Sequence, residues 1–244
     1  MQQQIQATRR WIRPLQWALC AAIVAAYISI DGTRLDPFRA PPAPGSPTRA
    51  ELSVLLDAVT TVPARPRPGG YERACSHGQA CVFGPAWTDI NDAAHGRDGC
   101  DTRNNALALT LGHVTYQDDT AQCVVLSGTL PDPYSGEVVE FHRSDGSAIH
   151  IDHIYPLAAA WDFGASQWPL ARRIQFANDV EFNLLAVNRS ANMDKGDKTP
   201  ADWLPPHPSY RCYYAAKYLS VAIEYDLPIT VADHDSLADV AERC

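Results

Sequence analysis

An aspartate and a histidine stand side by side at the end of the alternating apolar segment IHIDH, whose last residue is His153. Further along the chain, Asn183 precedes an apolar run, and Asn192 follows nine positions after it. A carboxylate and an amide carbonyl are hard oxygen ligands that suit Mg²⁺, an ion that tolerates few protein ligands and keeps several waters. A neutral histidine beside such an ion can take a proton from a water that attacks a phosphate. The set Asp152, His153 and Asn192 therefore predicts metal-assisted hydrolysis of a phosphate ester.

The charge of the chain limits how it could meet a polyanion. Its 28 acidic and 20 basic residues give a net charge of −8, and residues 1–50 hold six of the basic and two of the acidic residues. The rest of the chain therefore has a net charge of −12. Such a body gains no long-range attraction to nucleic acid, which excludes a generic basic coat protein. Any phosphate chemistry needs a local site with its own cation.

Residues 1–35 are typical of an export segment. Three arginines precede an apolar run over residues 15–30 that contains no charged residue. At about 16 residues, this run is long for the core of a signal peptide and short for a membrane span of about 20. Because no clean small-x-small cleavage site is present, we favour an uncleaved membrane anchor with the body translocated, and a cleaved signal is the alternative. The proline-rich residues 36–48 are expected to form an extended linker.

Residues 49–244 are expected to form one α+β domain. Apolar patterning predicts strands at 123–128, 137–142, 148–153 and 184–187. Helices are predicted over 49–62 behind Thr48 as N-cap, and at 104–111, 157–161, 172–177, 210–225 and 236–243, and a further helix begins within 191–203. Residues 71–101 contain many turn formers and no predicted element, and 129–136 are predicted to be a turn.

Seven cysteines fit export to an oxidising compartment. Cys20 lies in the apolar run, and the other six are an even set with fifteen conceivable pairings. Local spacing favours three disulfides, namely Cys75–Cys81, Cys100–Cys123 and Cys212–Cys244. A structural zinc site is the alternative, but the chain contains no Cys-x-x-Cys pair.

The motifs around the Asp-His pair carry a family resemblance. The order Asp-His, then Asn183 before a strand, then Asn192 on a helix resembles the HNH (ββα-metal, or His-Me finger) nucleases. Within these, the sequence resembles the C-terminal nuclease domain of GmrSD-type restriction endonucleases, in its secreted branch. The likeness extends over residues 71–244 and rests on motifs such as GCDTRNNAL, DPYSGEVVEF, IDHIYPLAAAW, FANDVEFNLLAV and ANMDKGDK. It implies a ββα-metal finger embedded in a disulfide-stapled single domain.

The resemblance also implies a role for each residue of the set. His153 would be the general base, and Asp152 and Asn192 would hold the metal ion. Asn183 would be the structural asparagine that fixes the finger loop and orients the base. Because zinc-bound relatives carry a histidine at the position of Asn192, the resemblance favours Mg²⁺ or Mn²⁺ as the cofactor.

Four further residues are candidates for the site. Arg103 is expected to clamp a phosphate through its planar guanidinium, with Asp101 supporting it. A structural ion pair beside Cys100 is the alternative for these two. Lys195 and Lys198 are expected to contact the substrate backbone, and an ordinary charged helix face is the alternative for them.

One more histidine, His150, shares a strand face with Asp152 and is either an extra ligand or an ordinary strand histidine. The expected function is a metal-dependent endonuclease, anchored or secreted, that cleaves nucleic acid outside the cytoplasm, DNA rather than RNA. A non-catalytic exported binding module on the same scaffold is the second hypothesis. An effector nuclease accompanied by an immunity protein is the third, and the sequence does not separate it from a scavenging nuclease.

Overall fold

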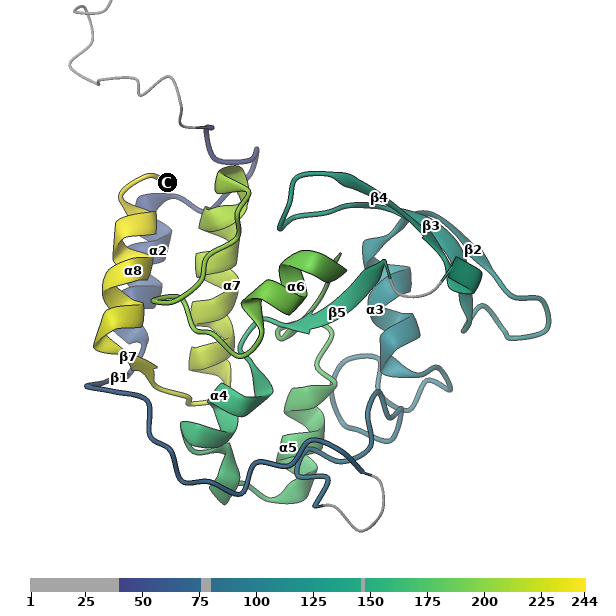
Figure 1. The fold of residues 1–244 in the computed structure, drawn as a ribbon, viewed down its shortest axis with the longest axis horizontal. Coiled ribbons are helices and arrows are strands. Elements are labelled where there is room, and N and C mark those ends of the chain that lie inside the picture. The colour runs from purple at the N-terminus through teal and green to yellow at the C-terminus, as the bar shows by residue number, and fades with distance from the viewer. Residues whose placement is uncertain (1–39, 76–79, 146–147) are drawn as a thin grey trace, which may run out of the picture. The chain divides into compact units, whose positions relative to one another are not determined.

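The computed structural model describes residues 40–75, 80–145 and 148–244, and residues 41–244 pack together as one unit (Figure 1). The predicted export segment, Cys20 and the first part of the predicted linker lie outside the described residues. Within the described ranges, no helix is long and apolar enough to cross a membrane. The last part of the predicted linker contacts the body, since Ala43 N donates to Ser209 O at 2.9 Å and the Tyr213 hydroxyl donates to Pro44 O at 3.1 Å.

Three helices pack side by side in one half of this unit: α2 (Arg49–Ala58), α7 (Arg211–Glu224) and α8 (Val231–Ala241) (Figure 1). Thr48 caps α2 through a capping box with Glu51, as predicted. The prediction of a helix over 49–62 is wrong at its C-terminal end. It stops at Ala58 because strand β1 (Thr61–Val62) pairs in parallel with β7 (Ile229–Thr230).

The other half contains a three-stranded antiparallel sheet of β2 (Gly112–Tyr116), β3 (Val125–Pro131) and β4 (Val138–His142), with helix α3 (Thr102–Thr110) beside it. The prediction of a turn over 129–136 is wrong for its first three residues. These residues continue β3 and pair with 138–140 of β4. Pro131 is tolerated there because it lies at the end of its strand, where no ladder hydrogen bond needs its nitrogen.

Two strands and a helix between these halves form a ββα unit, which confirms the topology that the resemblance implies. β5 (Ile149–His153) pairs antiparallel with β6 (Leu184–Asn188), and α6 (Arg189–Lys195) follows directly. Asn188 starts α6, because its side chain accepts hydrogen bonds from two main-chain N–H groups, and Gly196 with φ 55° ends it. Helices α4 (Leu157–Asp162) and α5 (Leu170–Ala177) lie between the two strands in the chain.

The described residues also contain three single-turn 3₁₀ helices, at Arg143–Asp145, Ala165–Gln167 and Pro208–Tyr210. Two hydrophobic clusters hold the unit together. The larger is rich in aromatic residues and lies among α2, α4, α5, α7 and α8. The smaller lies among α3, the three-stranded sheet and the β5–β6 pair. The ββα unit contributes to both clusters, which fixes it at their junction.

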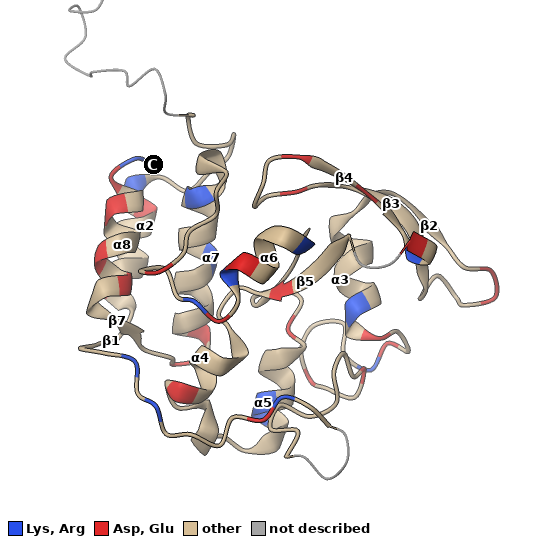
Figure 2. Ribbon diagram, in the orientation of Figure 1, with Lys and Arg blue, Asp and Glu red and all other residues tan. Residues whose placement is uncertain are grey.

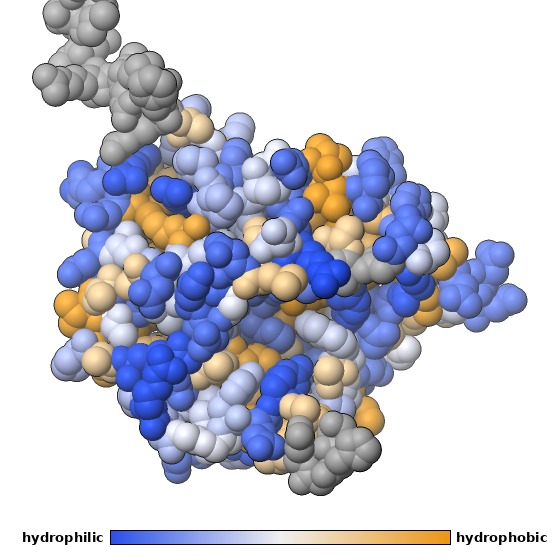
Figure 3. Space-filling model, viewed as in Figure 1, coloured by the Kyte–Doolittle hydropathy of each residue, from blue (hydrophilic) through white to orange (hydrophobic). Residues whose placement is uncertain are grey.

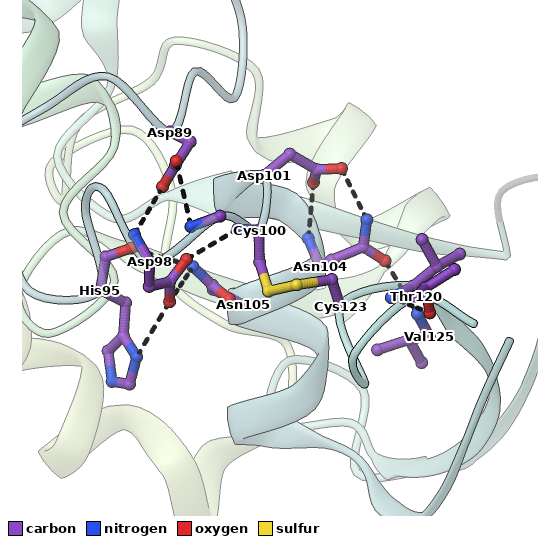
Figure 4. The surroundings of a disulfide bond; sticks show 12 residues. Asp89, His95, Asp98, Cys100, Asp101, Asn104, Asn105, Thr120, Cys123 and Val125 are labelled. Atoms are coloured by element: carbon purple, nitrogen blue, oxygen red, sulfur yellow. Dashed lines mark hydrogen bonds and ion pairs between the residues drawn. A yellow bond between two sulfur atoms is a disulfide. The ribbon is translucent and has the colours of Figure 1, made fainter. Parts of the chain in front are cut away.

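All three predicted disulfides are present: Cys75–Cys81, Cys100–Cys123 and Cys212–Cys244. Figure 4 shows the second, which joins the residue before Asp101 to the segment that leads into β3. The third joins the start of α7 to the last residue of the chain. The three disulfides therefore join residues that are 6, 23 and 32 positions apart in the sequence.

Removal of the Cys212–Cys244 disulfide should cost more stability than removal of Cys75–Cys81. The first pair spans a sequence separation of 32 residues and the second one of 6. A cross-link that restricts the unfolded chain stabilises by about 3.5 kcal/mol for the longer loop and about 2 kcal/mol for the shorter. We expect the two double-alanine variants to lose free energy of unfolding in that order in urea titrations. Equal losses, or a larger loss for the shorter loop, would contradict this account.

Candidate active site

A pocket of about 520 Å³ opens beside the ββα unit. It brings together three residues of the predicted set: Asp152, His153 and Asn192. Other parts of its wall come from the start of α4, from the residues after α6 and from Tyr71, Arg73 and Trp87. The sequence distance between these segments is large, so the pocket exists only in the folded chain.

The imidazole of His153 is held from two sides. Its Nε2 lies 3.0 Å from the carbonyl oxygen of Ala177, and its ring stacks on Trp87 with centroids 5.8 Å apart and an interplanar angle of 14°. Because a carbonyl can only accept, Nε2 carries the proton and Nδ1 is left as the acceptor. Burial is the main cause that lowers the pKa of His153 to about 3, and the positive charges of Arg73 and Lys195 act in the same direction. The ring is therefore neutral at physiological pH.

The carboxylate of Asp152 is buried and has two partners. It accepts a hydrogen bond of 2.6 Å from the Tyr134 hydroxyl, and the ammonium of Lys195 lies 2.9 Å from both of its oxygens. Burial raises the pKa of the Asp152 carboxyl, while Lys195 and the Tyr134 hydrogen bond oppose that rise. These contacts fix the orientation of Asp152 at the wall of the pocket.

Lys195 does not lie where a substrate contact requires it. Its side chain is completely buried, and the ammonium also donates to the carbonyl oxygen of His153 at 2.7 Å. The amphipathic pattern of α6 places a lysine at its end but does not reveal that the neighbouring strand covers it. Lys198 is partly exposed, donates to Asp194 O at 2.6 Å and forms an ion pair with the Asp194 carboxylate. It does not line the pocket.

Asn183 is fully buried beneath the turn that follows β5. Its Oδ1 accepts from Tyr155 N at 2.9 Å, and its Nδ2 donates to Phe176 O at 3.3 Å. Its own carbonyl accepts from Ile154 N at 2.8 Å. One side chain thus joins the end of β5 to the end of α5, where Ala177 contacts His153.

Asn192 projects from α6 next to His150. Its Nδ2 lies 3.2 Å from Nδ1 of His150, and since an amide nitrogen can only donate, that ring nitrogen is the acceptor. Burial, together with the charges of Arg189 and Arg103, lowers the pKa of His150 and keeps it able to accept. His150 therefore orients the side-chain amide of Asn192 through its nitrogen. The amide oxygen is left to bind a different partner.

Asp101 and Arg103 are separate from the pocket wall. Asp101 is the N-cap of α3, where it accepts from the main chain and the side chain of Asn104 at 2.8 and 2.6 Å (Figure 4). Arg103 donates to the carbonyl oxygen of Ile149, at the start of β5, at 3.2 Å. Among the ion pairs of the described ranges, none joins Asp101 to Arg103.

The donor set at the pocket fits a hard divalent cation. In the part of the chain that the structure describes, no three histidine, cysteine or acidic side chains cluster as a metal site. One carboxylate and one amide, from Asp152 and Asn192, line the same pocket instead. Two such oxygens, completed by water and substrate, match the few protein ligands that Mg²⁺ uses, and they do not match the nitrogen and sulfur ligands of zinc.

Four residues that build the site were not predicted as site residues from the sequence. Tyr134 lies in the segment between β3 and β4, and Tyr71, Arg73 and Trp87 lie in the turn-rich stretch before α3. The charge distribution offers no broader clue, since basic residues are scattered over the ribbon in Figure 2. The face shown in Figure 3 likewise has only separate hydrophobic patches.

These features define an α+β protein, stapled by disulfides, whose ββα unit gathers an aspartate, a neutral histidine and an asparagine around one pocket. The chain belongs to the family described as GmrSD restriction endonucleases, C-terminal domain, which matches residues 101–240. Membership implies a nuclease with a nucleic-acid substrate. The loop 71–87 lies outside the matched residues.

The chain is also similar to an "Uncharacterized secreted protein" of Arthroderma benhamiae. The two are 32% identical over 209 residues, which cover 85% of this chain and 92% of that protein. No solved structure matches the chain. Disulfides such as these three are typical of extracellular proteins. The relative is likewise described as secreted.

Replacement of Lys195 should destabilise the fold far more than replacement of Lys198. Lys195→Met leaves the Asp152 carboxylate buried without its cation, which costs about 3–5 kcal/mol. Lys198→Met removes a partly exposed pair with Asp194, worth less than about 1 kcal/mol. Urea unfolding of both variants measures the difference, and adding Asp152→Asn to Lys195→Met should recover part of the loss. Similar small losses for the two lysines would refute the buried pair.

Proposed function

We propose that the protein is an HNH-type endonuclease that hydrolyses phosphodiester bonds in nucleic acid with a divalent metal ion. One observation carries the proposal. The imidazole Nε2 of His153 lies 3.0 Å from the carbonyl oxygen of Ala177, in a pocket that is also lined by Asp152 and Asn192. The family match supports the substrate class.

In this reaction Nδ1 of His153 takes a proton from the attacking water. The ring can accept a proton only at Nδ1, because Nε2 already donates to the carbonyl oxygen of Ala177. Trp87 holds the plane of the ring by stacking, and Asn183 holds the turn that sets the end of β5. The negative charge of a bound phosphate favours the imidazolium, so the pKa of His153 rises when substrate is bound.

Asp152 and Asn192 would hold Mg²⁺ or Mn²⁺, and the bound ion would neutralise negative charge on the phosphate and the leaving oxygen. Tyr134 and Lys195 keep the carboxylate of Asp152 in place. His150 keeps the amide of Asn192 in place from the neighbouring strand. In this assignment His150 and Lys195 position ligands and do not themselves touch the substrate.

Asp101 and Arg103 act through the fold in this proposal. Asp101 caps α3 and Arg103 joins α3 to the start of β5, so together they set the strand that carries Asp152 and His153. Lys198 is partly exposed beside α6, where it could exchange Asp194 for a substrate phosphate. Cleavage of DNA rather than RNA, an anchor or signal in residues 1–35 and an immunity protein as partner belong to the same proposal.

Replacement of His153 should remove most of the cleavage. General-base catalysis contributes about 10²- to 10⁴-fold to a rate. We therefore expect the full chain carrying His153→Ala to nick supercoiled plasmid at least about 100-fold more slowly than the parent in Mg²⁺. His142→Ala changes an exposed histidine on β4 and should cleave at the parental rate. A chelator should stop cleavage by the parent.

Parental cleavage by a folded His153→Ala variant would contradict the assignment of the base. A parent that cleaves neither plasmid nor RNA, and that binds neither Mg²⁺ nor Mn²⁺, would favour the non-catalytic binding module instead. Circular dichroism of each variant separates loss of activity from loss of fold.

Replacement of Asn192 should weaken metal binding without unfolding the protein. The residue supplies one of two proposed protein ligands, so we expect Asn192→Ala to raise the Mn²⁺ dissociation constant about 10- to 100-fold, as measured by electron paramagnetic resonance. Asn192→Asp, which keeps an oxygen ligand, should retain binding. Met193→Ala changes the exposed neighbour on the same helix and should leave the affinity unchanged. Equal affinities for Asn192→Ala and Met193→Ala would exclude Asn192 as a ligand.

A further inference from the structure

The described residues 71–75 bring one cation, Arg73, to the pocket. Arg73 is a pocket-lining residue and is half-buried. Its Nη1 donates to the carbonyl oxygen of Gly84 at 3.3 Å, and no carboxylate in the described ranges forms an ion pair with its guanidinium. A guanidinium has five N–H donors, so this single contact leaves most of them unused.

The other charges around the pocket are already paired. The carboxylate of Asp152 is matched by Lys195 at 2.9 Å. Asp197, the second acidic residue of the wall, lies 3.1 Å from Arg65, which also pairs with Asp162 at 2.8 Å. Each charged residue of the wall other than Arg73 thus has an ion-pair partner within the described ranges. An anion would supply a partner for Arg73.

The described residues on both sides of Arg73 are tied to their surroundings. The Cys75–Cys81 disulfide joins the two described parts of this segment, and the ring of Tyr71 packs edge-on against Phe83 at 6.3 Å. Gly84 turns the chain with φ 70° and lies so close to α5 that a Cβ there would come within 2.5 Å of the Ile174 side chain. The carbonyl that orients Arg73 is thus fixed against a helix of the core.

We propose that Arg73 binds a phosphate of the nucleic-acid backbone in this pocket, beside His153. The chemistry fits, because a planar guanidinium binds phosphate oxygens through two parallel hydrogen bonds and cannot lose its proton. The inference rests on the proposed function, since it assigns the substrate contact of the same site. It replaces Lys195, which is buried, as the residue that meets the backbone.

The test measures binding apart from cleavage. In the full chain, His153→Ala slows turnover, and the affinity for a fluorescent DNA duplex is followed by anisotropy at several salt concentrations. Arg73→Gln is added to one sample and Arg97→Gln to another. Arg97 is an exposed arginine paired with Asp92 outside the pocket, so both variants change the net charge equally. Glutamine at position 73 can still donate to Gly84, which preserves the loop.

We expect Arg73→Gln to weaken binding about 10-fold and to reduce the slope of log affinity against log salt by about 0.9, the value for one lost phosphate contact. Arg97→Gln should change affinity less than about two-fold. Arg73→Lys should restore the slope and only part of the affinity. Equal behaviour of Arg73→Gln and Arg97→Gln, or a parent that does not bind the duplex, overturns the inference.

The outcomes for the two proposals remain distinct. A parent that binds DNA through Arg73 but does not cleave it would overturn the nuclease and leave the phosphate contact standing. A parent that cleaves DNA while binding is indifferent to Arg73 would overturn the contact alone.

Discussion

The buried ion pair between Lys195 and Asp152 is the interaction on which the site depends. One ammonium at the end of α6 holds the carboxylate on β5 and the carbonyl oxygen of His153, so the helix cannot shift against the strand. A buried charge destabilises a fold unless its partners are complete. Here Lys195 has its acceptors and Asp152 also has Tyr134. The pocket is therefore preorganised, with its oxygen ligands and its base set before any ligand binds.

This preorganisation explains how an acidic protein can act on a polyanion. The net charge of the body repels nucleic acid at long range, and the basic residues of the described chain are scattered along the ribbon in Figure 2. In the proposed mechanism, attraction arises inside the pocket, from a bound cation and from Arg73, which lines it. Such an arrangement favours modest affinity that depends strongly on the metal and allows easy release of the product.

The parts of the fold that follow from neighbouring residues were predictable from the sequence. The strand ending at His153, the helix carrying Asn192 and the three disulfides depend on alternation, capping and short spacing. The strands β1 and β7 were missed because two residues carry no periodic signal. The burial of Lys195 was missed because it depends on how α6 crosses β5. Trp87 and Arg73 reach the pocket through a turn-rich loop whose docking on α5 has no local pattern.

The proposed mechanism requires a neutral His153 with its proton on Nε2 and with Nδ1 free. Nitrogen chemical shifts of the imidazole, recorded by NMR on ¹⁵N-labelled protein at neutral pH and assigned with His153→Ala, measure the tautomer directly. We predict a neutral ring whose protonated nitrogen is Nε2, because the carbonyl oxygen of Ala177 accepts that proton. A ring protonated at Nδ1, or an equal mixture of the two tautomers, would contradict the account.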